Sequence, residues 1–348
     1  MSLDDRKKKI LHAIVDDYVT TFEPVGSKAL IERHDFTVSS ATLRNEMAEL
    51  EKQGFIEKPH TSAGRIPSDR GYREYVDSLI NVDVLTDKEK KEIRGRITES
   101  VDDVSDLLKN ASNTLSEQTG FVSLAMSPKL RKSFLTQLKM LMIEPGKALV
   151  VVVLSAGVVK DKVVRIPNYL TNEQIYQISN AVEQTLSGKP LEEITLVTVA
   201  TAAKKTKLPE SLLNQILYEA YTAIKQADKL NVYLEGEHRM LQLPDFGTLG
   251  RARDLLDTLS DDGMVAGYIN EIESSGADDD SYMIRIGQEI ALEGLEDCSF
   301  ITSTYKLGND ISGNIGIIGP KRMEYAKVIS QINFVRKTLN EEIKKLNE

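Results

Sequence analysis

The chain has 348 residues, which at about 150 residues per domain indicates two or three domains and excludes a small stapled scaffold. Hydrophobic residues make up 41% and charged residues 28%, an ordinary globular composition, and no apolar run is long enough to cross a bilayer. The formal net charge of −9 argues against a protein that coats nucleic acid with its whole surface, but it leaves room for a confined DNA-reading surface.

The single cysteine, Cys298, can form neither an intrachain disulfide nor a multi-thiolate metal site, so nothing requires an oxidising compartment. Residues 6–9 are basic, but the apolar segment that follows them is too short for a signal peptide and soon turns acidic at Asp16 and Asp17. We therefore expect a cytoplasmic protein.

The first fifty residues show three helical patterns. Residues 4–22 carry apolar side chains at helical spacing, and a short second helix starts at Ser27. A third helix is expected over residues 40–53, and Gly54 stands where a left-handed residue usually ends a helix. Two short strands around the turn-rich residues 59–64 follow. This order is that of a winged helix-turn-helix, whose third helix enters the major groove.

The middle of the chain changes from helical to strand periodicity. After a helix at 69–80, a charged stretch at 83–96 marks the first domain boundary. Further elements are expected as a helix at 98–116, strands at 137–144, 148–154 and 158–166, then helix, strand (194–200) and helix within 171–226.

The last third repeats the change of pattern. Helical segments at 238–273 precede an acidic stretch, and then strands are expected at 282–286, 298–305 and 313–318, followed by a final helix at 322–346. Two groups of strands on either side of a mostly helical block indicate one α+β domain that carries an insertion.

The third helix presents a candidate surface for reading bases. Leu43, Met47 and Leu50 define its apolar face, so the opposite face holds Ala41, Asn45 and Ala48, flanked by Thr42 and Arg44. Small side chains allow close approach, asparagine can pair bidentately with adenine, and arginine can reach guanine or a phosphate. Ser39 and Ser40 at the helix N-terminus suit a phosphate, although Ser39 also fits a simple helix cap.

Charge alone does not decide between DNA binding and an ordinary solvated face. Residues 1–80 contain 12 Lys and Arg against 14 Asp and Glu, a net charge of −2. The glutamates lie in the later turns of the third helix, whereas Lys58, His60 and Arg65 gather in the loop between the strands, so the surface offered to DNA can be basic.

Four longer runs stand out in the sequence: residues 23–28, 38–51, 59–67 and, near the C-terminus, 313–325. These runs resemble the heat-inducible transcription repressors of the HrcA family. Departures are modest: Gln288-Glu289-Ile290 stands where a Gly-x-Glu-Asn-like sequence is expected, and Glu46 and Lys321 are mild variants.

The resemblance implies an α+β multidomain protein with an N-terminal winged helix-turn-helix, a split GAF-like α/β domain and an inserted α+β dimerisation domain. We expect the winged helix at 1–82, a connecting helical segment at 83–117, the GAF-like domain at 118–167 and 228–348, and the inserted domain at 168–227. The resemblance also implies a homodimer that binds double-stranded DNA at the inverted-repeat operator CIRCE, with the GroE chaperonin as a modulator of its activity. The candidate DNA contacts are Ser39, Ser40, Ala41, Thr42, Arg44 and Asn45 in the recognition helix, and Ser27, Lys28, Lys58, His60, Thr61 and Arg65 in the wing and its flanks.

Other chemistry finds little support in the sequence. Gly313, Gly316 and Gly319 are spaced like a phosphate loop, but the isoleucines between them favour a strand. The four histidines lack metal-ligand spacing, Cys298 fits a small buried hydrophobe, and the run 278–280 lacks the calcium-loop pattern. We expect no enzymatic activity, metal or cofactor. The alternative function is a metabolite-sensing regulator with a small-molecule site in the GAF-like domain.

Overall fold

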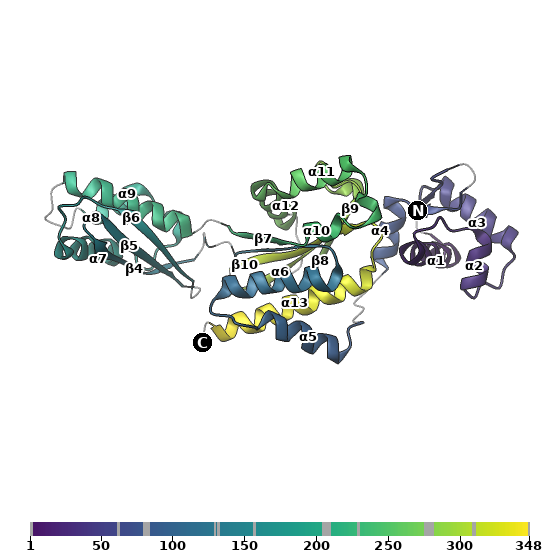
Figure 1. Ribbon diagram of the computed structural model, residues 1–348, viewed down its shortest axis with the longest axis horizontal. Coiled ribbons are helices and arrows are strands. Elements are labelled where there is room, and N and C mark those ends of the chain that lie inside the picture. The colour runs from purple at the N-terminus through teal and green to yellow at the C-terminus, as the bar shows by residue number, and fades with distance from the viewer. Residues whose placement is uncertain are drawn as a thin grey trace.

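The computed structural model describes residues 3–60, 63–78, 84–128, 130, 133–155, 158–203, 210–227, 230–274, 282–307 and 311–346. Helices and strands form three bodies along one long axis (Figure 1). We name them the N-terminal body (residues 3–78), the central body (residues 84–126 and 232–346) and the inserted body (residues 133–227). The N-terminal and inserted bodies lie at opposite ends of the central body.

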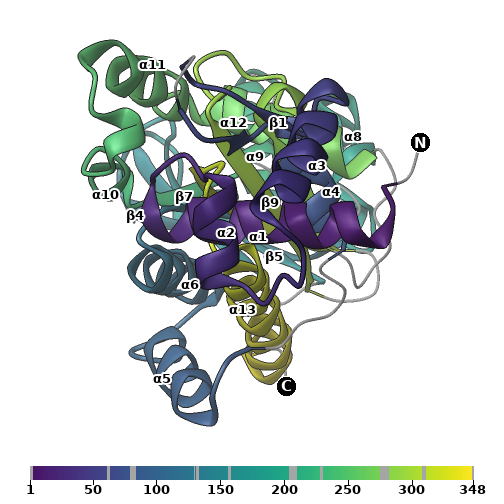
Figure 2. The ribbon, with the colours of Figure 1, turned by 90° about the vertical axis from the view of Figure 1, so that its right-hand side faces the viewer.

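Three helices and a two-stranded sheet build most of the N-terminal body. Its elements are α1 (Asp5–Thr21), α2 (Ser27–Arg33), α3 (Ser40–Lys52), β1 (Ile56–Glu57), β2 (Ile66–Pro67) and α4 (Asp69–Asp77). The two strands pair antiparallel, as the sequence predicts. Figure 2 shows α1, α2 and α3 in front when the molecule is viewed from this end. Their apolar faces meet in one core that contains Ile10, Leu11, Ile14, Leu30, Leu43, Met47 and Leu50.

A five-stranded antiparallel sheet forms the centre of the molecule. Its order is β7 (Val232–Glu235), β3 (Val122–Met126), β10 (Ser312–Pro320), β9 (Cys298–Lys306) and β8 (Tyr282–Ile286). One face is covered by α6 (Val104–Thr119) and α13 (Tyr325–Leu346), with α5 (Asp87–Ile97) beside them. The other face is covered by α10 (Glu237–Met240), α11 (Leu249–Leu259) and α12 (Asp262–Ser274).

The inserted body contains its own sheet. The strands β4 (Leu135–Glu144), β5 (Lys147–Leu154) and β6 (Val159–Arg165) pair only with one another, and they pack against α7 (Asn172–Leu186) and α9 (Glu210–Ala227). A short helix, α8 (Leu196–Ala203), joins those two helices. The chain leaves the central sheet after β3 and returns at β7, its direct neighbour, where Met126 is the partner of Val232.

This arrangement corrects two predictions. Of the strands within 118–167, β3 joins the central sheet, whereas β4, β5 and β6 form a separate sheet that buries its apolar face under α7 and α9. The insertion therefore begins shortly after Met126 and not at residue 168. The strand predicted at 194–200 is instead the helix α8, whose packing between α7 and α9 overrides the strand preference of its valines and threonines.

Most other predicted elements are confirmed within a few residues, including the strands at 137–166, 282–286, 298–305 and 313–318. The acidic stretch at 278–280 lies outside the described residues.

Candidate nucleic-acid interface

Hydrogen bonds hold the first turn of α3 in place. The Ser39 hydroxyl accepts a hydrogen bond from the Thr42 amide at 3.1 Å, so Ser39 is the N-cap, and it also lies 2.9 Å from the Thr42 hydroxyl. The Ser40 hydroxyl lies 3.0 Å from that of Ser27, which is buried at the first turn of α2. These bonds hold the N-termini of the two helices together.

The two faces of α3 separate as the sequence predicts. Leu43, Met47 and Leu50 are buried against α1, whereas the outer face is open to solvent. On that outer face Ala41, Arg44, Asn45 and Ala48 are exposed, and so are Glu49 and Lys52 toward its C-terminal end. The outer face of α3 therefore combines two small side chains, one amide and one guanidinium with an acidic and a basic residue in its later turns.

Cations from other elements pair with the acidic residues of α3. Lys7 of α1 pairs with Glu49 at 3.0 Å and with Glu46 at 3.4 Å, and Arg65 pairs with Glu51 at 2.7 Å. Arg44 forms no ion pair with the described residues. The net charge of −2 for residues 1–80 therefore does not describe the surroundings of Arg44, whose positive charge is exposed and not paired with the described residues.

Lys7 is a residue that sequence reasoning missed. Hydrogen bonds to Asp4 and Glu49 raise the pKa of its ammonium group, so it stays charged throughout the physiological range. Its pairing with Glu46 and Glu49 joins residues about forty positions apart. No local motif signals such a contact.

Three of the predicted wing and flank residues are exposed and available. Lys58 and His60 follow β1, and Lys28 lies in the first turn of α2. None of these three side chains is engaged in an ion pair with the described part of the chain. Thr61 lies outside the described residues.

Two other predicted contacts, Arg65 and Ser27, are used inside the body. The backbone of Arg65 exchanges two hydrogen bonds of 2.8 Å with Val25, and its side chain is only 15% exposed and pairs with Glu51. Arg65 therefore ties the start of β2 to α3 and to the segment before α2. Ser27 likewise ties α2 to α3, so these two residues position the surface rather than form its outermost layer.

The space between the central sheet and the helices α10 to α12 is filled with apolar side chains. This second core includes Met240, Phe246, Tyr268, Cys298 and Phe300. The Cys298 thiol is buried, and desolvation raises its pKa, as expected of a structural cysteine. Gly313, Gly316 and Gly319 lie within the strand β10 and not in a phosphate loop.

Comparison with solved structures supports the fold. A crystal structure titled as a hypothetical protein superposes over 99% of this chain and 100% of its own, with a TM-score of 0.68 and 24% sequence identity. This match shows a common fold of mixed helices and strands and carries no functional information.

Comparison with families and curated proteins identifies the chain. The model of the HrcA protein C-terminal domain matches residues 105–329. The heat-inducible transcription repressor HrcA of Ruminiclostridium cellulolyticum is 42% identical over 99% of both chains. The chain belongs to the HrcA family. The HrcA of Acetivibrio thermocellus is 38% identical over 99% of this chain and 98% of its own.

Membership in the HrcA family covers the whole chain. The family model begins at residue 105, but the relatives extend the match over the N-terminal body as well. The chain therefore shares the family's character as a heat-inducible transcription repressor. No helix in the described part of the chain is long and apolar enough to span a membrane.

Proposed function

We propose that this chain represses chaperone operons by binding an inverted-repeat operator of the CIRCE type as a homodimer. In this proposal the N-terminal body is a winged helix-turn-helix, α3 is its recognition helix, and the loop after β1 is its wing. The observation that carries the proposal is the outer face of α3, where Arg44 and Asn45 are exposed while Glu46, Glu49 and Glu51 are paired elsewhere.

The chemistry of this face fits the major groove, which is wide enough for a helix and displays a distinct pattern for each base pair. We assign Arg44 and Asn45 to base edges, and Ala41 to close approach of the helix. The hydroxyls of Ser39, Ser40 and Thr42 lie at the N-terminus of α3, where they and the backbone amides suit a phosphate. Lys28, Lys58 and His60 contact the DNA backbone or minor groove, and Thr61 is assigned to the same wing.

The inserted body supports the homodimer. Residues of its sheet alternate, so that one face is buried under α7 and α9 while the opposite face is open. On the open face Leu141 and Val163 lie on either side of Leu149, and Val159 lies opposite Val153. Leu141, Val159 and Val163 are each more than half exposed. We name these residues, together with Val151, the open sheet face.

The open sheet face is largely apolar, although Lys139 and Asp161 lie on either side of Val151. Exposed apolar side chains are costly in water, and such a face is suited to a second copy of itself, since two sheets can pack face to face. A two-fold dimer also matches an inverted repeat, because each protomer reads one half-site. We propose that the open sheet face forms the dimer interface and that residues 133–227 are the dimerisation domain.

Heat release and assistance by the GroE chaperonin are part of the proposal. A chain that exposes an apolar interface as a monomer is prone to aggregate when heating dissociates or unfolds it, and a chaperonin would restore it. Operator binding that survives a heat pulse unchanged in the absence of chaperonin would contradict this part.

The metabolite-sensing alternative is disfavoured by the filled core between the central sheet and α10 to α12. A GAF-like fold does not by itself establish ligand binding. A specific effector must raise the melting temperature by mass action, so a thermal-shift screen of small molecules tests the alternative directly.

The experiment that tests the main proposal measures binding of the full chain to two labelled duplexes, an inverted repeat and a scrambled control, at two salt concentrations. We expect a preference of about a thousandfold or more for the inverted repeat, and weaker binding to both at high salt. Equal affinity for the two duplexes would contradict sequence-specific repression.

A further inference from the structure

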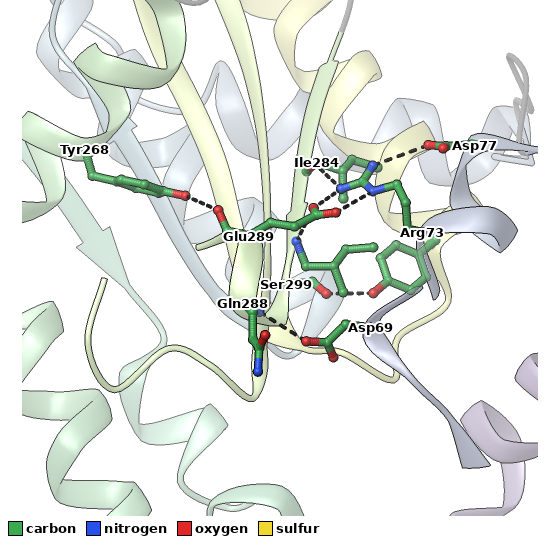
Figure 3. Close-up of polar contacts among 10 residues, drawn as sticks. Asp69, Arg73, Asp77, Tyr268, Ile284, Gln288, Glu289 and Ser299 are labelled. Carbon is green, nitrogen blue, oxygen red and sulfur yellow. Dashed lines mark hydrogen bonds and ion pairs between the residues drawn. The ribbon is translucent and has the colours of Figure 1, made fainter. Parts of the chain in front are cut away.

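Helix α4 is the last helix of the N-terminal body, and it contacts the central body. Asp69 and Arg73 are one helical turn apart, so their side chains lie on the same face of α4, toward β8 and the 3-10 turn that follows it (Gly287–Glu289). Figure 3 shows both side chains directed at this turn.

Arg73 forms a two-point contact across the boundary. Its Nε donates to one carboxylate oxygen of Glu289 at 2.9 Å, and its Nη2 pairs with the other oxygen. The same Nη2 donates to the carbonyl of Ile284 at 2.6 Å. Bidentate contacts between guanidinium and carboxylate groups restrict orientation as well as distance, so this pair resists rotation of α4.

Asp69 forms the second point of attachment. One of its carboxylate oxygens accepts a hydrogen bond from the backbone N–H of Gln288 at 3.1 Å, and the other pairs with the Lys321 ammonium at 2.8 Å. Gly287 permits this approach, because its φ is +55° and a Cβ there would overlap the Asp69 carboxylate. We name Asp69, Arg73, Glu289 and Lys321 the α4 clamp.

Residues of α4 that point away from the clamp attach it to the end of α3. The Ser68 hydroxyl, which caps α4, donates to the carbonyl of Gly54 at 2.6 Å, and Arg70 donates to the carbonyl of Gln53 at 2.7 Å. A Cβ on Gly71 would overlap the carbonyl oxygen of Phe55, so α4 touches this segment directly. Any rotation of α4 is therefore passed to α3.

We propose that Asp69 and Arg73 are positioning residues that hold α3 at one orientation relative to the central body and so set the half-site spacing that a dimer accepts. This inference rests on the proposed function. The inserted body lies at the end of the molecule opposite to the N-terminal body. If two protomers join through their inserted bodies, the angle between α4 and the central body decides where the two copies of α3 meet the DNA. Each base pair added between half-sites shifts one of them by about 3.4 Å and about 34°.

The partial exposure of the α4 clamp side chains also agrees with a role in orienting α3. The side chains of Arg73 and Glu289 are 28% and 34% exposed, so solvent screens part of their attraction, and the bidentate contact acts mainly by restricting orientation. The effect of breaking them is therefore expected in the spacing preference rather than in the stability of either body.

The test uses the full-length double variant Asp69→Asn, Glu289→Gln. The new amide oxygen of Asp69→Asn can still accept the hydrogen bond from the backbone N–H of Gln288, and that of Glu289→Gln can accept the one from Ile286. The negative charges that pair with Lys321 and Arg73 are lost. The control is Arg253→Gln, which removes an ion pair with Asp257 inside the single helix α11. Affinities are measured for one isolated half-site and for inverted repeats whose spacers differ by one base pair.

The wild type and the control are expected to favour one spacer over its neighbours by about tenfold, within the usual range of coupling between sites. The double variant should bind the isolated half-site as tightly as the wild type but lose most of this preference, and Arg73→Lys, which keeps the charge without the bidentate contact, should be intermediate. An unchanged spacer profile in the double variant would overturn the inference. Loss of half-site affinity would also overturn it, because the clamp would then support the fold of the N-terminal body. A wild type that binds no inverted repeat would instead refute the proposed function.

Discussion

Lys58 illustrates a contact that adds affinity without sequence information. It is exposed after β1, in the part of the wing that would face a phosphate. We expect Lys58→Ala to weaken binding to the inverted repeat and to the scrambled duplex by the same factor, and to reduce the slope of log affinity against log salt by about 0.9. Titrations at several salt concentrations measure both. Lys344→Ala, at the exposed end of α13, serves as the control, and a selective loss on the inverted repeat would show that Lys58 reads bases.

We expect His12 to make the stability of the N-terminal body depend on pH. Its ring packs edge-on against Tyr75 at 5.1 Å, and its Nε2 lies 3.0 Å from the Ser78 hydroxyl. Burial lowers the pKa of His12 despite the nearby carboxylates of Asp16 and Glu74. The folded state therefore favours the neutral ring, and its contribution to stability is lost as pH falls below the unfolded value of about 6.5.

We expect the melting temperature of the wild type to fall more between pH 7 and pH 5 than that of His12→Gln, which cannot be protonated. Differential scanning calorimetry at both pH values measures the difference. Parallel decreases in the two proteins would show that His12 does not contribute to the pH dependence.

Sequence periodicity predicts which residues of α3 face inward, because the burial of Leu43, Met47 and Leu50 follows from their spacing. It does not predict that Lys7 neutralises Glu46 and Glu49, or that Arg65 is committed to Glu51. These ion pairs depend on the relative positions of separate helices, and local sequence patterns do not predict those positions. The sequence therefore predicts which residues lie on the outer face of α3, but not which of its charged residues are paired.

At the scale of elements, α4 depends on a glycine for its contact with the end of α3. Gly71→Ala should improve helix propensity, but its Cβ would overlap the backbone oxygen of Phe55. We expect the clash to dominate and to destabilise the N-terminal body by about 1–3 kcal/mol. Gly95→Ala in α5 is the matched control, since nothing lies within 4 Å of its Cβ, and it should stabilise by up to about 1 kcal/mol. Thermal and urea denaturation followed by circular dichroism measure both, and a stabilising Gly71→Ala would contradict the close contact.

The elements show where sequence patterns stop being sufficient. Long periodic segments such as α1, α3 and α13 and the strands β4 to β6 lie close to their predicted positions. The helix α8 was predicted as a strand, and the four-residue strand β7 was not predicted, because packing decides the state of such short segments. The assignment of β4 to β6 to the wrong sheet has the same origin, since strand pattern does not reveal the partner.

At the scale of the whole molecule, the open sheet face should hold two chains together. We expect Val163→Asp, in which a carboxylate replaces a half-exposed valine on that face, to raise the dimer dissociation constant by about tenfold or more, because each dimer would bury two unpaired charges. Light scattering across a concentration series measures the dissociation. Leu249→Asp is the control, because Leu249 of the central body is 88% exposed. An unchanged dimer would move the interface away from this face.

The central claim is that α3 reads the operator through its outer face, and Asn45→Ala tests it most directly. The measurement is the ratio of affinities for the inverted repeat and for a scrambled duplex, taken at one salt concentration. We predict that the variant loses about 1–3 kcal/mol of this preference per half-site while its affinity for the scrambled duplex stays unchanged, because only the pairing with a base edge is removed. An affinity ratio equal to that of the wild type would contradict the claim.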